Sequence, residues 1–473
     1  MRIALVKMQD TAKQSLLTAA QYPVNLAYLA STCQERGHEV ELWDFVVEPM
    51  ERELVEERIR RFQPQVIGVS CVTSAMNFGK LFARWVKEID ENIYTILGGV
   101  HITVLPIETL NEAPEFDLGV VTEGEETLPE ILDILEKGHA PIGIAGTVYR
   151  ENGKPMLTGC RDFPDVNKIP YPNRDLLPSE LYLNKHSVRG LSRKTWNIIE
   201  VDSSRGCPFR CTFCNVEVTH GRKVRYRTPQ HVLGEVEACV KKYGTNCVVF
   251  NDSTFTFKKS RVKELVLGLP KVGIEGYHVN GHVKTVDAAM LQTLAETGCQ
   301  KISFGVESGS QRVLDKILKN ATLEEIREAF TMAKRSGIPI VEGTFILGSD
   351  IEETEEDFAS TGQLMRELRP DIVGMGIITP FPGTAQYTEM KSAGYLEGVP
   401  WDDYQIFAET PPPWRLKNFS AQELVEHRNR MLKAYYWNLP YIFNQLTKIR
   451  SVSDVLYYMG MMRSFYKVVV RNA

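Results

Sequence analysis

A regular alternation of short apolar segments with amphipathic segments constrains the fold of this 473-residue chain more than any other feature. Residues 2–8, 64–72 and 94–99 are apolar runs of strand length, and segments with helical periodicity separate them. Continuous apolar strands separated by amphipathic helices are typical of a parallel sheet with helices on both faces. A second series with the same alternation begins near residue 197. We therefore expect two α/β domains.

The two series differ in expected architecture. Residues 1–145 predict a doubly wound, Rossmann-like sheet, whose ligands bind at the carboxyl ends of the strands. Residues 196–400 contain six strand–helix units, which predict a partial (β/α)6 barrel with its functional groups at the same strand ends. The proline-rich residues 146–195 predict a linker. Residues 401–473 lack the alternation and predict a mostly helical C-terminal region.

Composition narrows the class of protein. The net charge of −5 at pH 7 does not suggest nucleic-acid binding. No apolar run approaches the roughly 20 residues of a membrane-spanning helix. The N-terminus is typical of a strand rather than a signal peptide. Apart from one group of three, the nine cysteines are scattered and do not suggest a disulfide framework, so we expect a reducing, cytoplasmic location.

Cys207, Cys211 and Cys214 form that group, with the spacing C-x3-C-x2-C. Three thiolates on one tight loop can face a single inorganic group. Zinc is one alternative, because Cys3His sites exist and His220 follows closely, but no second cysteine pair recurs downstream. An iron–sulfur cluster bound by three cysteines would leave one iron open to a substrate or cofactor. The spacing favours the cluster.

Loops at the carboxyl ends of three N-terminal strands contain small residues, with Gly98, Gly99 and Gly124 among them. A single glycine would indicate only a turn. Three such loops on one edge of a doubly wound sheet instead favour a large ligand that approaches the backbone closely.

The cysteine spacing, its place after the first strand of a barrel and the aromatic Phe213 before the last cysteine together resemble the radical S-adenosylmethionine enzymes. The resemblance implies that Cys207, Cys211 and Cys214 bind a [4Fe–4S] cluster, whose open iron binds S-adenosylmethionine. One-electron cleavage would give a 5′-deoxyadenosyl radical, which removes a hydrogen atom from an unactivated carbon. An electron donor such as a flavodoxin or a ferredoxin would supply the electron.

The same resemblance implies contacts to S-adenosylmethionine. Phe213 would pack near the adenine. Asn251 and Asp252 are candidates to hold the methionine amine, although the common glycine-glycine-glutamate form is absent there. Glu307 and Ser308 would contact the ribose or the carboxylate.

Some of these positions keep a structural alternative. Glu307 could instead cap the following helix, and His282, at the end of another barrel strand, could be a satisfied core histidine. Residues 343–354 resemble the adenine-binding motif of the fifth strand, but Ser349 and Asp350 stand where leucine and proline are usual. The contacts in that motif stay open.

A resemblance to the cobalamin-binding domain of cobalamin-dependent radical S-adenosylmethionine enzymes lies in four N-terminal segments: PVNLAYLAS, IGVSCVTS, LGGVHITVLP and TEGEET. The D-x-H-x-x-G motif is absent, so no histidine is offered to the cobalt, and His101 is expected to be a loop contact. By resemblance, Thr73, Met76 and Asn77 would lie nearest the lower face of the corrin, and the next two loops would hold the nucleotide tail. The expected cobalamin contacts are Ser70, Thr73, Met76, Asn77, Gly98, Gly99, His101, Glu123, Gly124 and Glu125.

Two reactions fit this architecture. We favour C-methylation, in which methylcobalamin delivers a methyl group to a carbon that the radical has activated. The alternative is oxidative ring closure of a tetrapyrrole without methyl transfer, as in the anaerobic cyclase of bacteriochlorophyll biosynthesis. An alternative of another class is a non-catalytic, zinc-stabilised binding protein. Methylthiotransferases that modify tRNA share the barrel and carry extra cluster cysteines in the N-terminal domain and a basic RNA-binding tail domain. Cys33, Cys71 and Cys160 do not recur in suitable loops, so this alternative is set aside.

The C-terminal region is aromatic, rich in methionine and basic, with ten Lys/Arg and three Asp/Glu from residue 415 onward. Its aromatic residues could close the open side of the barrel or dock on an anionic membrane surface. The layout resembles hopanoid C-3 methylases. We therefore expect a small hydrophobic substrate, such as a hopanoid-like lipid or a tetrapyrrole, and peripheral contact with the inner face of the membrane.

Overall fold

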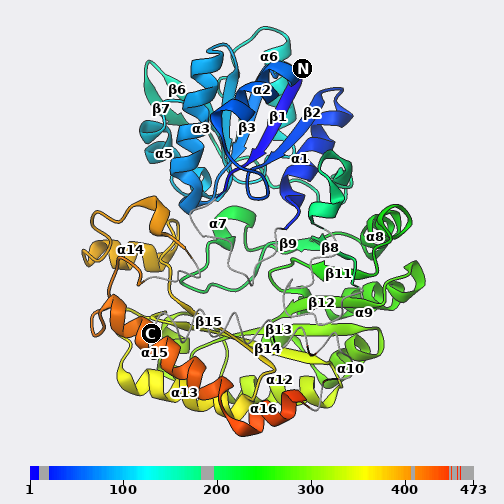
Figure 1. Cartoon of the computed structure of the whole chain (residues 1–473), viewed down its shortest axis with the longest axis vertical. Coiled ribbons are helices and arrows are strands. Elements are labelled where there is room, and N and C mark those ends of the chain that lie inside the picture. The colour runs from blue at the N-terminus through cyan, green and yellow to red at the C-terminus, as the bar shows by residue number, and fades with distance from the viewer. Residues whose placement is uncertain are drawn as a thin grey trace.

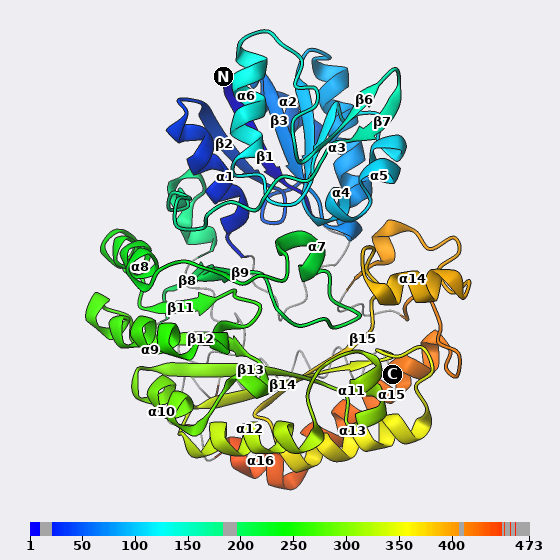
Figure 2. The same ribbon diagram turned by 180° about the vertical axis from the view of Figure 1, so that it is seen from behind.

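A computed structural model of the chain describes residues 1–9, 21–182, 196–405 and 411–446, together with residues 449, 455 and 459. Two α/β domains lie one above the other, with the short helix α7 (Val216–His220) between them in both views (Figures 1 and 2). The expected fold class is confirmed: a doubly wound N-terminal domain precedes a partial barrel and C-terminal helices.

The N-terminal sheet has seven strands in the order β2-β1-β3-β4-β5-β6-β7. The first five are parallel, and β6 and β7 pair antiparallel at one edge. Its strands are β1 (Arg2–Lys7), β2 (Glu39–Asp44), β3 (Val66–Ser70), β4 (Tyr94–Gly98), β5 (Leu118–Val120), β6 (Thr147–Glu151) and β7 (Lys154–Leu157). The last two lie in the range expected to be linker and instead extend the sheet. A tight turn at Asn152 and Gly153 joins β6 to β7, and both residues have positive φ.

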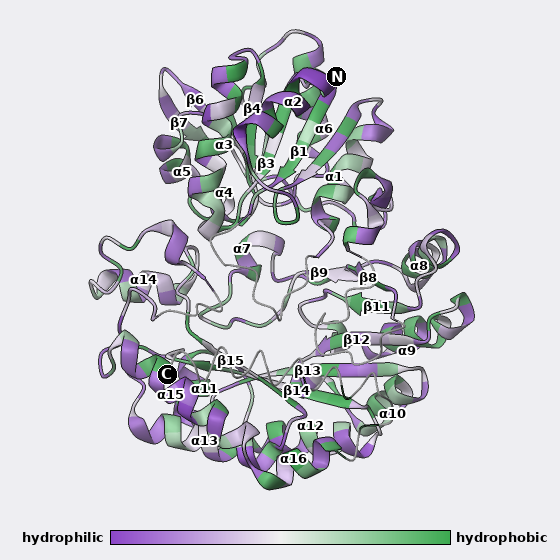
Figure 3. Cartoon of the chain, in the orientation of Figure 1, coloured by the Kyte–Doolittle hydropathy of each residue, from purple (hydrophilic) through white to green (hydrophobic). Residues whose placement is uncertain are grey.

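Helices cover both faces of this sheet because the apolar residues of its strands alternate between two cores. Ile3 and Leu5 of β1 join a core with α1 and α6, whereas Ala4 and Val6 join a core with α2 and α3. The strands are accordingly among the most apolar parts of the domain (Figure 3). The helices are α1 (Val24–Glu35), α2 (Arg52–Phe62), α3 (Met76–Ile89), α4 (Val100–Val104), α5 (Pro106–Glu112) and α6 (Thr127–Glu136).

The second sheet has six parallel strands in the order β15-β14-β13-β12-β11-β8, which among the described residues form an open, partial barrel. Its strands are β8 (Ile198–Val201), β11 (Cys247–Phe250), β12 (Gly276–Gly281), β13 (Cys299–Glu307), β14 (Ile340–Leu347) and β15 (Ile372–Ile377). Its helices are α8 (Pro229–Tyr243), α9 (Lys259–Gly268), α10 (Ala288–Glu296), α11 (Gln311–Lys316), α12 (Leu323–Arg335), α13 (Glu355–Leu368) and α14 (Ala385–Ser392).

The two faces of the barrel sheet differ in packing. On β14, Val341 and Phe345 are buried in the core beneath the helices. Glu342 and Thr344 alternate with them on the inner face and stay partly exposed. On β15 the partly exposed positions are Ile372, Gly374 and Gly376, so this end of the inner face is accessible and combines polar with apolar and small residues.

The C-terminal helices α15 (Ala421–Tyr436) and α16 (Leu439–Leu446) cover the edge strand β15. Tyr436 Oη accepts a hydrogen bond from the Val373 N–H at 2.9 Å and donates to the Val373 carbonyl at 3.0 Å. Tyr441 Oη donates to the Asp371 carbonyl at 3.0 Å. These hydroxyls satisfy backbone groups that an edge strand would otherwise expose. No described helix is long and apolar enough to span a membrane.

Candidate active site

The three cysteines lie on a loop that leaves and re-enters the barrel through a two-stranded ribbon. This cysteine loop, residues 206–224, runs from β9 (Ser204–Arg205) to β10 (Arg225–Tyr226), which pair antiparallel. Gly206 has a φ of 93°, and a Cβ there would lie 2.7 Å from the Lys223 carbonyl oxygen. Only glycine tolerates this conformation and approach. The ribbon therefore fixes both ends of the loop.

The barrel supports the middle of the cysteine loop from two sides. The Thr212 N–H donates to the Ile317 carbonyl at 3.1 Å, and the Gln386 N–H donates to the Thr212 carbonyl at 3.1 Å. Cys207 and Cys211 are half-buried, and Cys214 is exposed. The cysteine loop is thus held at its ends and its middle, and its three thiols stay at least partly exposed.

A buried ion pair lies beside the cysteines. Lys319 Nζ is 2.7 Å from Glu307 Oε1, and both side chains are almost fully buried. Although burial lowers the pKa of Lys319, the Glu307 carboxylate and Cys211 raise it overall. A fixed positive charge next to thiolates stabilises their charged form. Lys319 was not identified from the sequence.

Strained backbone positions Glu307 for this pair. Its φ of 66° is left-handed, and the register of β13 with β14 shifts between Gly305 and Glu307. A Cβ at Gly305 would lie 2.3 Å from Glu307 Oε1 and 2.7 Å from Lys319 Nζ, so the pair occupies the space that glycine leaves. Such strain clusters at functional sites. The helix-capping alternative is wrong, because the N-cap of α11 is Ser310.

Asp252 is placed differently from its expected role. It is buried, and its carboxylate accepts hydrogen bonds from the Ser203 N–H at 2.7 Å, from Ser203 Oγ at 2.6 Å and from Ser204 Oγ. These contacts hold the segment that enters the cysteine loop. The neighbouring Asn251 is half-buried and better placed than Asp252 to meet a ligand.

His282 supports the cysteine loop from below. Its ring stacks on Phe209 of that loop with centroids 3.8 Å apart, and its Nε2 lies 3.3 Å from the Lys319 carbonyl oxygen. Burial and the nearby Lys319 lower its pKa to about 3, so the ring is neutral. Phe213 packs half-buried against the barrel core, and Ser308 is buried, with its hydroxyl accepting from the Ser310 N–H at 3.2 Å.

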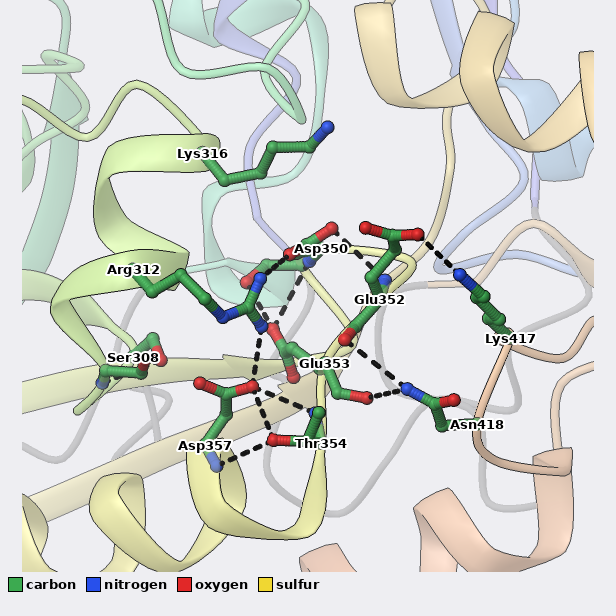
Figure 4. A network of polar contacts seen from close by, with 12 residues as sticks. Ser308, Arg312, Lys316, Asp350, Glu352, Glu353, Thr354, Asp357, Lys417 and Asn418 are labelled. Carbon is green, nitrogen blue, oxygen red and sulfur yellow. Dashed lines mark hydrogen bonds and ion pairs between the residues drawn. The ribbon is translucent and has the colours of Figure 1, made fainter.

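A polar network holds the turn after β14, where Ser349 and Asp350 replace the usual leucine and proline (Figure 4). Glu353 accepts hydrogen bonds from the Gly348 N–H at 2.8 Å and from Ser349 Oγ at 2.9 Å. Arg312 of α11 bridges Asp350 at 2.7 Å and Asp357 at 2.6 Å. The turn is therefore shaped by charge pairing instead of proline stiffness.

This network predicts a pH dependence of stability. Burial raises the pKa of the Glu353 carboxyl from 4.5 to about 7, against the hydrogen bonds from Gly348 and Ser349. The folded state therefore holds the proton more tightly than the unfolded chain. The contribution of the protonated Glu353 carboxyl to the free energy of unfolding is complete below pH 4.5. It is lost as the pH rises to about 7, by up to about 3 kcal/mol.

We expect the thermal unfolding midpoint to decrease as the pH is raised from 4.5 to 7. The Glu353→Gln variant should show a weaker dependence of this midpoint on pH. Glu352→Gln is the matched control, because Glu352 is exposed and pairs with Lys417 at 2.7 Å. An unchanged slope in the Glu353 variant would contradict the assignment.

The loop after β3 does not present the residues expected at the corrin. The short helix of residues 73–75 turns Thr73 inward, and Thr73 and Met76 are each only 2% exposed. Val72 is instead 48% exposed. Asn77 is exposed, but its Nδ2 donates to Asp402 Oδ1 of the C-terminal region at 2.9 Å. Ser70 is half-buried at the end of β3.

His101 and the glycines join two loops at this edge. His101 is buried, with Nδ1 3.2 Å from Thr73 Oγ1 and its ring edge-on to Trp401 at 4.9 Å. Burial lowers its pKa to about 4. Gly99 has a φ of 98°, and a Cβ there would lie 2.5 Å from the Cys71 carbonyl oxygen. Gly99 therefore lets the loops after β3 and β4 touch, whereas a Cβ at Gly98 would meet only the Val69 carbonyl oxygen at 3.9 Å. At Gly99 the close approach expected of a ligand is made by the Cys71 backbone.

Glu123 and Glu125, expected to hold the nucleotide tail, instead contact the barrel. Glu123 pairs with Arg205, His220 and Arg225, and Glu125 pairs with Arg205. Gly124 lies between them, and a Cβ added there would be 3.2 Å from Leu29 Cδ2, so Gly124 packs closely on that side chain. Both carboxylates are thus engaged at the domain interface.

The donor set fits the expected cofactors. Three cysteines on one fixed loop suit a cubane, in which each thiolate binds a different iron, so the sulfurs need not converge on one point. Within the described ranges, no three His, Cys, Asp or Glu side chains are grouped so as to hold a single metal ion. Ser70 and Gly98 end the paired strands β3 and β4, so short side chains stand at the edge of the N-terminal sheet where a corrin would lie.

Comparisons with known proteins agree with this arrangement. The model of the B12 binding domain matches residues 18–132, and that of the radical SAM superfamily matches residues 201–365. An uncharacterized methyltransferase of Pyrococcus horikoshii is 31% identical over 439 residues, which cover 92% of each chain.

Two further proteins are more distant. The anaerobic magnesium-protoporphyrin IX monomethyl ester cyclase of Rubrivivax gelatinosus is 25% identical over 94% of this chain and 79% of its own. The solved structure of the cobalamin-dependent S-adenosylmethionine radical enzyme OxsB, at 16% identity, superposes with a TM-score of 0.75 over 98% of this chain and 71% of that one.

Proposed function

Because this chain belongs to the family of cobalamin-dependent radical S-adenosylmethionine enzymes, we propose that it methylates an unactivated carbon of a small substrate. Its cofactors are a [4Fe–4S] cluster, S-adenosylmethionine and cobalamin. When bound, they supply hydrogen-atom abstraction and a transferable methyl group. The observation that carries the proposal is the relative named a methyltransferase, which aligns with both domains at 31% identity.

The chain's own residues hold and orient these groups. Cys207, Cys211 and Cys214 supply the thiolates for the cluster, and the β9–β10 ribbon fixes their loop. We assign Phe213 of the cysteine loop to S-adenosylmethionine, together with Asn251 and Glu307 at the ends of β11 and β13. The resemblance adds Ser308 to this set, but its buried hydroxyl lies against Thr361 of α13 and the Ser310 N–H, so we give it a supporting role at the strand end. Asp252 positions the start of the loop through Ser203 and Ser204 and does not contact the methionine in this assignment.

The inner face of the barrel suggests an amphipathic substrate. Lys301 Nζ pairs with Glu342 Oε2 at 2.7 Å, and Ser303 Oγ donates to the same carboxylate. His278 Nε2 lies 3.1 Å from Ser303 Oγ. Partly exposed apolar residues such as Ile346 share this face with the polar groups. Lys301, Ser303 and His278 are themselves buried. Because Glu342 and Thr344 stay partly exposed beside Ile346, a hydrophobic skeleton that carries hydrogen-bonding groups would fit better than a purely apolar lipid.

Oxidative cyclisation is the second candidate. The cyclase of Rubrivivax gelatinosus aligns with 94% of this chain, and the site residues described above serve either reaction. The two candidates differ in the fate of the methyl group.

Product analysis separates them. The protein would be reconstituted anaerobically with iron, sulfide and cobalamin, and supplied with a reduced flavodoxin or ferredoxin and S-adenosylmethionine. Formation of 5′-deoxyadenosine and S-adenosylhomocysteine in step, on addition of a candidate substrate, is the expected result. Deoxyadenosine alone would favour cyclisation. Zinc in place of iron, with neither product, would overturn both and support the zinc-stabilised binding protein.

The C-terminal region supports a peripheral membrane contact as part of this proposal. Leu439 and Phe443 of α16 are 79% and 70% exposed. Residues 428–450 contain five Lys/Arg and no Asp/Glu. An apolar helical face beside basic residues is complementary to an anionic lipid surface. The tyrosines of the same region instead bind the edge strand β15, so the exposed apolar residues of α16 are the ones that we propose for the membrane contact.

Phe443→Glu is expected to weaken binding to phosphatidylglycerol vesicles about tenfold, because burial of one large apolar side chain contributes about 1.5–3 kcal/mol. Co-sedimentation measures it. Ile142→Glu is the matched control, since Ile142 is an exposed apolar residue of the N-terminal domain. Equal binding of both variants and the wild type would exclude α16 as the contact.

A further inference from the structure

One carboxylate of the N-terminal domain contacts both ends of the cysteine loop. Glu123 Oε2 lies 2.9 Å from Arg205 Nη1 at the start of the loop and 2.9 Å from Arg225 Nη1 at its end. Glu123 Oε1 contacts Arg225 Nη2 and lies 2.8 Å from His220 Nδ1. Glu125 Oε1 adds a contact to Arg205 Nη2 at 2.7 Å. We name these five residues the clasp.

The clasp is shielded from water and reinforced by aromatic rings. The side chain of Glu123 is 3% exposed, and those of Arg205 and Arg225 are 11% and 13% exposed. The Arg205 guanidinium lies over the Tyr28 ring at 5.3 Å, and that of Arg225 lies over the Phe163 ring at 4.5 Å. Ion pairs in such surroundings are screened much less than surface pairs, and their geometry is well defined.

The backbone before Glu123 is strained in a way that aims this side chain. Thr122 has a φ of 64°, which is a genuine outlier for a β-branched residue and costs about 1–3 kcal/mol. Its N–H donates to Thr103 Oγ1 at 2.9 Å, and Thr103 Oγ1 donates to the Gly99 carbonyl at 2.8 Å. The loop after β4 is thereby connected through Thr103 and Thr122 to Glu123.

These contacts join the two places where the cofactors bind. Gly99 and Thr122 belong to loops at the cobalamin-binding edge, and Arg205 lies two residues before Cys207. Transfer between two bound cofactors and one substrate demands a fixed geometry, and a misplacement of about 1 Å can cost about 100-fold in rate.

We propose that Glu123 is a positioning residue whose clasp on both ends of the cysteine loop sets the alignment of the cluster with the corrin. Glu123 touches neither reacting group in this assignment. Its role differs from the expected contact with the nucleotide tail. The proposed alignment requires only that the chain binds the cofactors of its family. The expected effect on the product ratio depends in addition on the proposed methylation.

A second interdomain network provides the matched control. Glu235 of α8 is buried, pairs with Arg174 and Arg227 at 2.6 Å each, and lies 3.4 Å from Tyr28 Oη of the N-terminal domain. It bridges the same domains, and among the described residues its partners Arg174, Arg227 and Tyr28 lie outside the cysteine loop, with Tyr28 also contacting Arg205 through its ring. Any effect of a merely loosened interface should therefore appear in Glu235→Gln as well as in Glu123→Gln.

The test uses holoenzyme that holds cob(II)alamin and the one-electron-reduced cluster, both paramagnetic. Pulsed EPR measures the dipolar coupling between them. We expect a narrow distribution of couplings in the wild type and in Glu235→Gln, and a broadened one in Glu123→Gln at unchanged cofactor content. Glu123→Asp, which keeps the charge on a shorter stem, should recover part of the narrow component.

The product ratio gives a second readout. We expect Glu123→Gln to raise the ratio of 5′-deoxyadenosine to methylated product about 10- to 100-fold. Wild-type coupling in Glu123→Gln, or equal broadening in Glu235→Gln, would overturn the proposal. If methylation fails in the wild type, the proposed function fails while the EPR result still decides the role of the clasp.

Discussion

Cys211→Ala is expected to abolish the iron–sulfur absorbance near 400 nm and to lower 5′-deoxyadenosine formation by more than about 100-fold. Loss of a group that only supports a metal ligand costs about 10–100-fold, so loss of a ligand should cost more. Burial raises the pKa of the Cys211 thiol to about 11, so a thiolate at this position depends on the bound cluster and the nearby Lys319. Absorbance and chromatographic quantitation of the nucleoside measure the two effects.

Cobalamin content should stay unchanged in this variant, because the N-terminal domain has hydrophobic cores of its own. Cys160→Ala is the matched control, since Cys160 is an exposed cysteine outside the cysteine loop. Full iron content in the Cys211 variant would contradict its assignment as a ligand. Parallel loss of cobalamin would instead indicate that the variant had not folded.

The features that could be predicted from the sequence are local in the chain. Periodicity over 5 to 15 residues identifies strands and helices, and parallel topology follows from their alternation. Cys207, Cys211 and Cys214 lie within eight residues, so their common loop could be predicted as well. The glycines of three loops at one sheet edge predict a close approach to the backbone, although the group that approaches Gly99 is the Cys71 backbone and not the expected ligand.

The features that could not be predicted depend on contacts between distant segments. Glu123 finds its partners 82 to 102 positions away, across the domain interface. Lys319, the partner of Glu307, lies between Leu318 and Asn320, which both have positive φ. Asparagine is common in that conformation, but leucine gives no such signal. The inward turn that buries Thr73 is a single short helical turn with no periodicity to detect. In each case the tertiary environment, rather than local propensity, decides where the side chain points.

Lys319→Met is expected to destabilise the barrel by about 3–5 kcal/mol, because it leaves the buried Glu307 carboxylate without its cation. Chemical unfolding of the cofactor-free protein measures the loss. Lys316→Met is the matched control: Lys316 is the last residue of α11, three positions before Lys319, is exposed and pairs with Glu389 at 3.3 Å. A loss of similar size in both variants would show that the buried pair has no special role.

The double variant Glu307→Gln/Lys319→Met separates stability from function. Removing both charges abolishes the uncompensated carboxylate, so we expect the double variant to regain at least about 2 kcal/mol relative to Lys319→Met. Cleavage of S-adenosylmethionine should not recover with it, because Glu307 is assigned to that ligand and its left-handed backbone is the strained feature of the strand end. If stability and S-adenosylmethionine cleavage both recovered, the ion pair would have only a structural role. If stability alone recovered, Glu307 would have a role in the reaction.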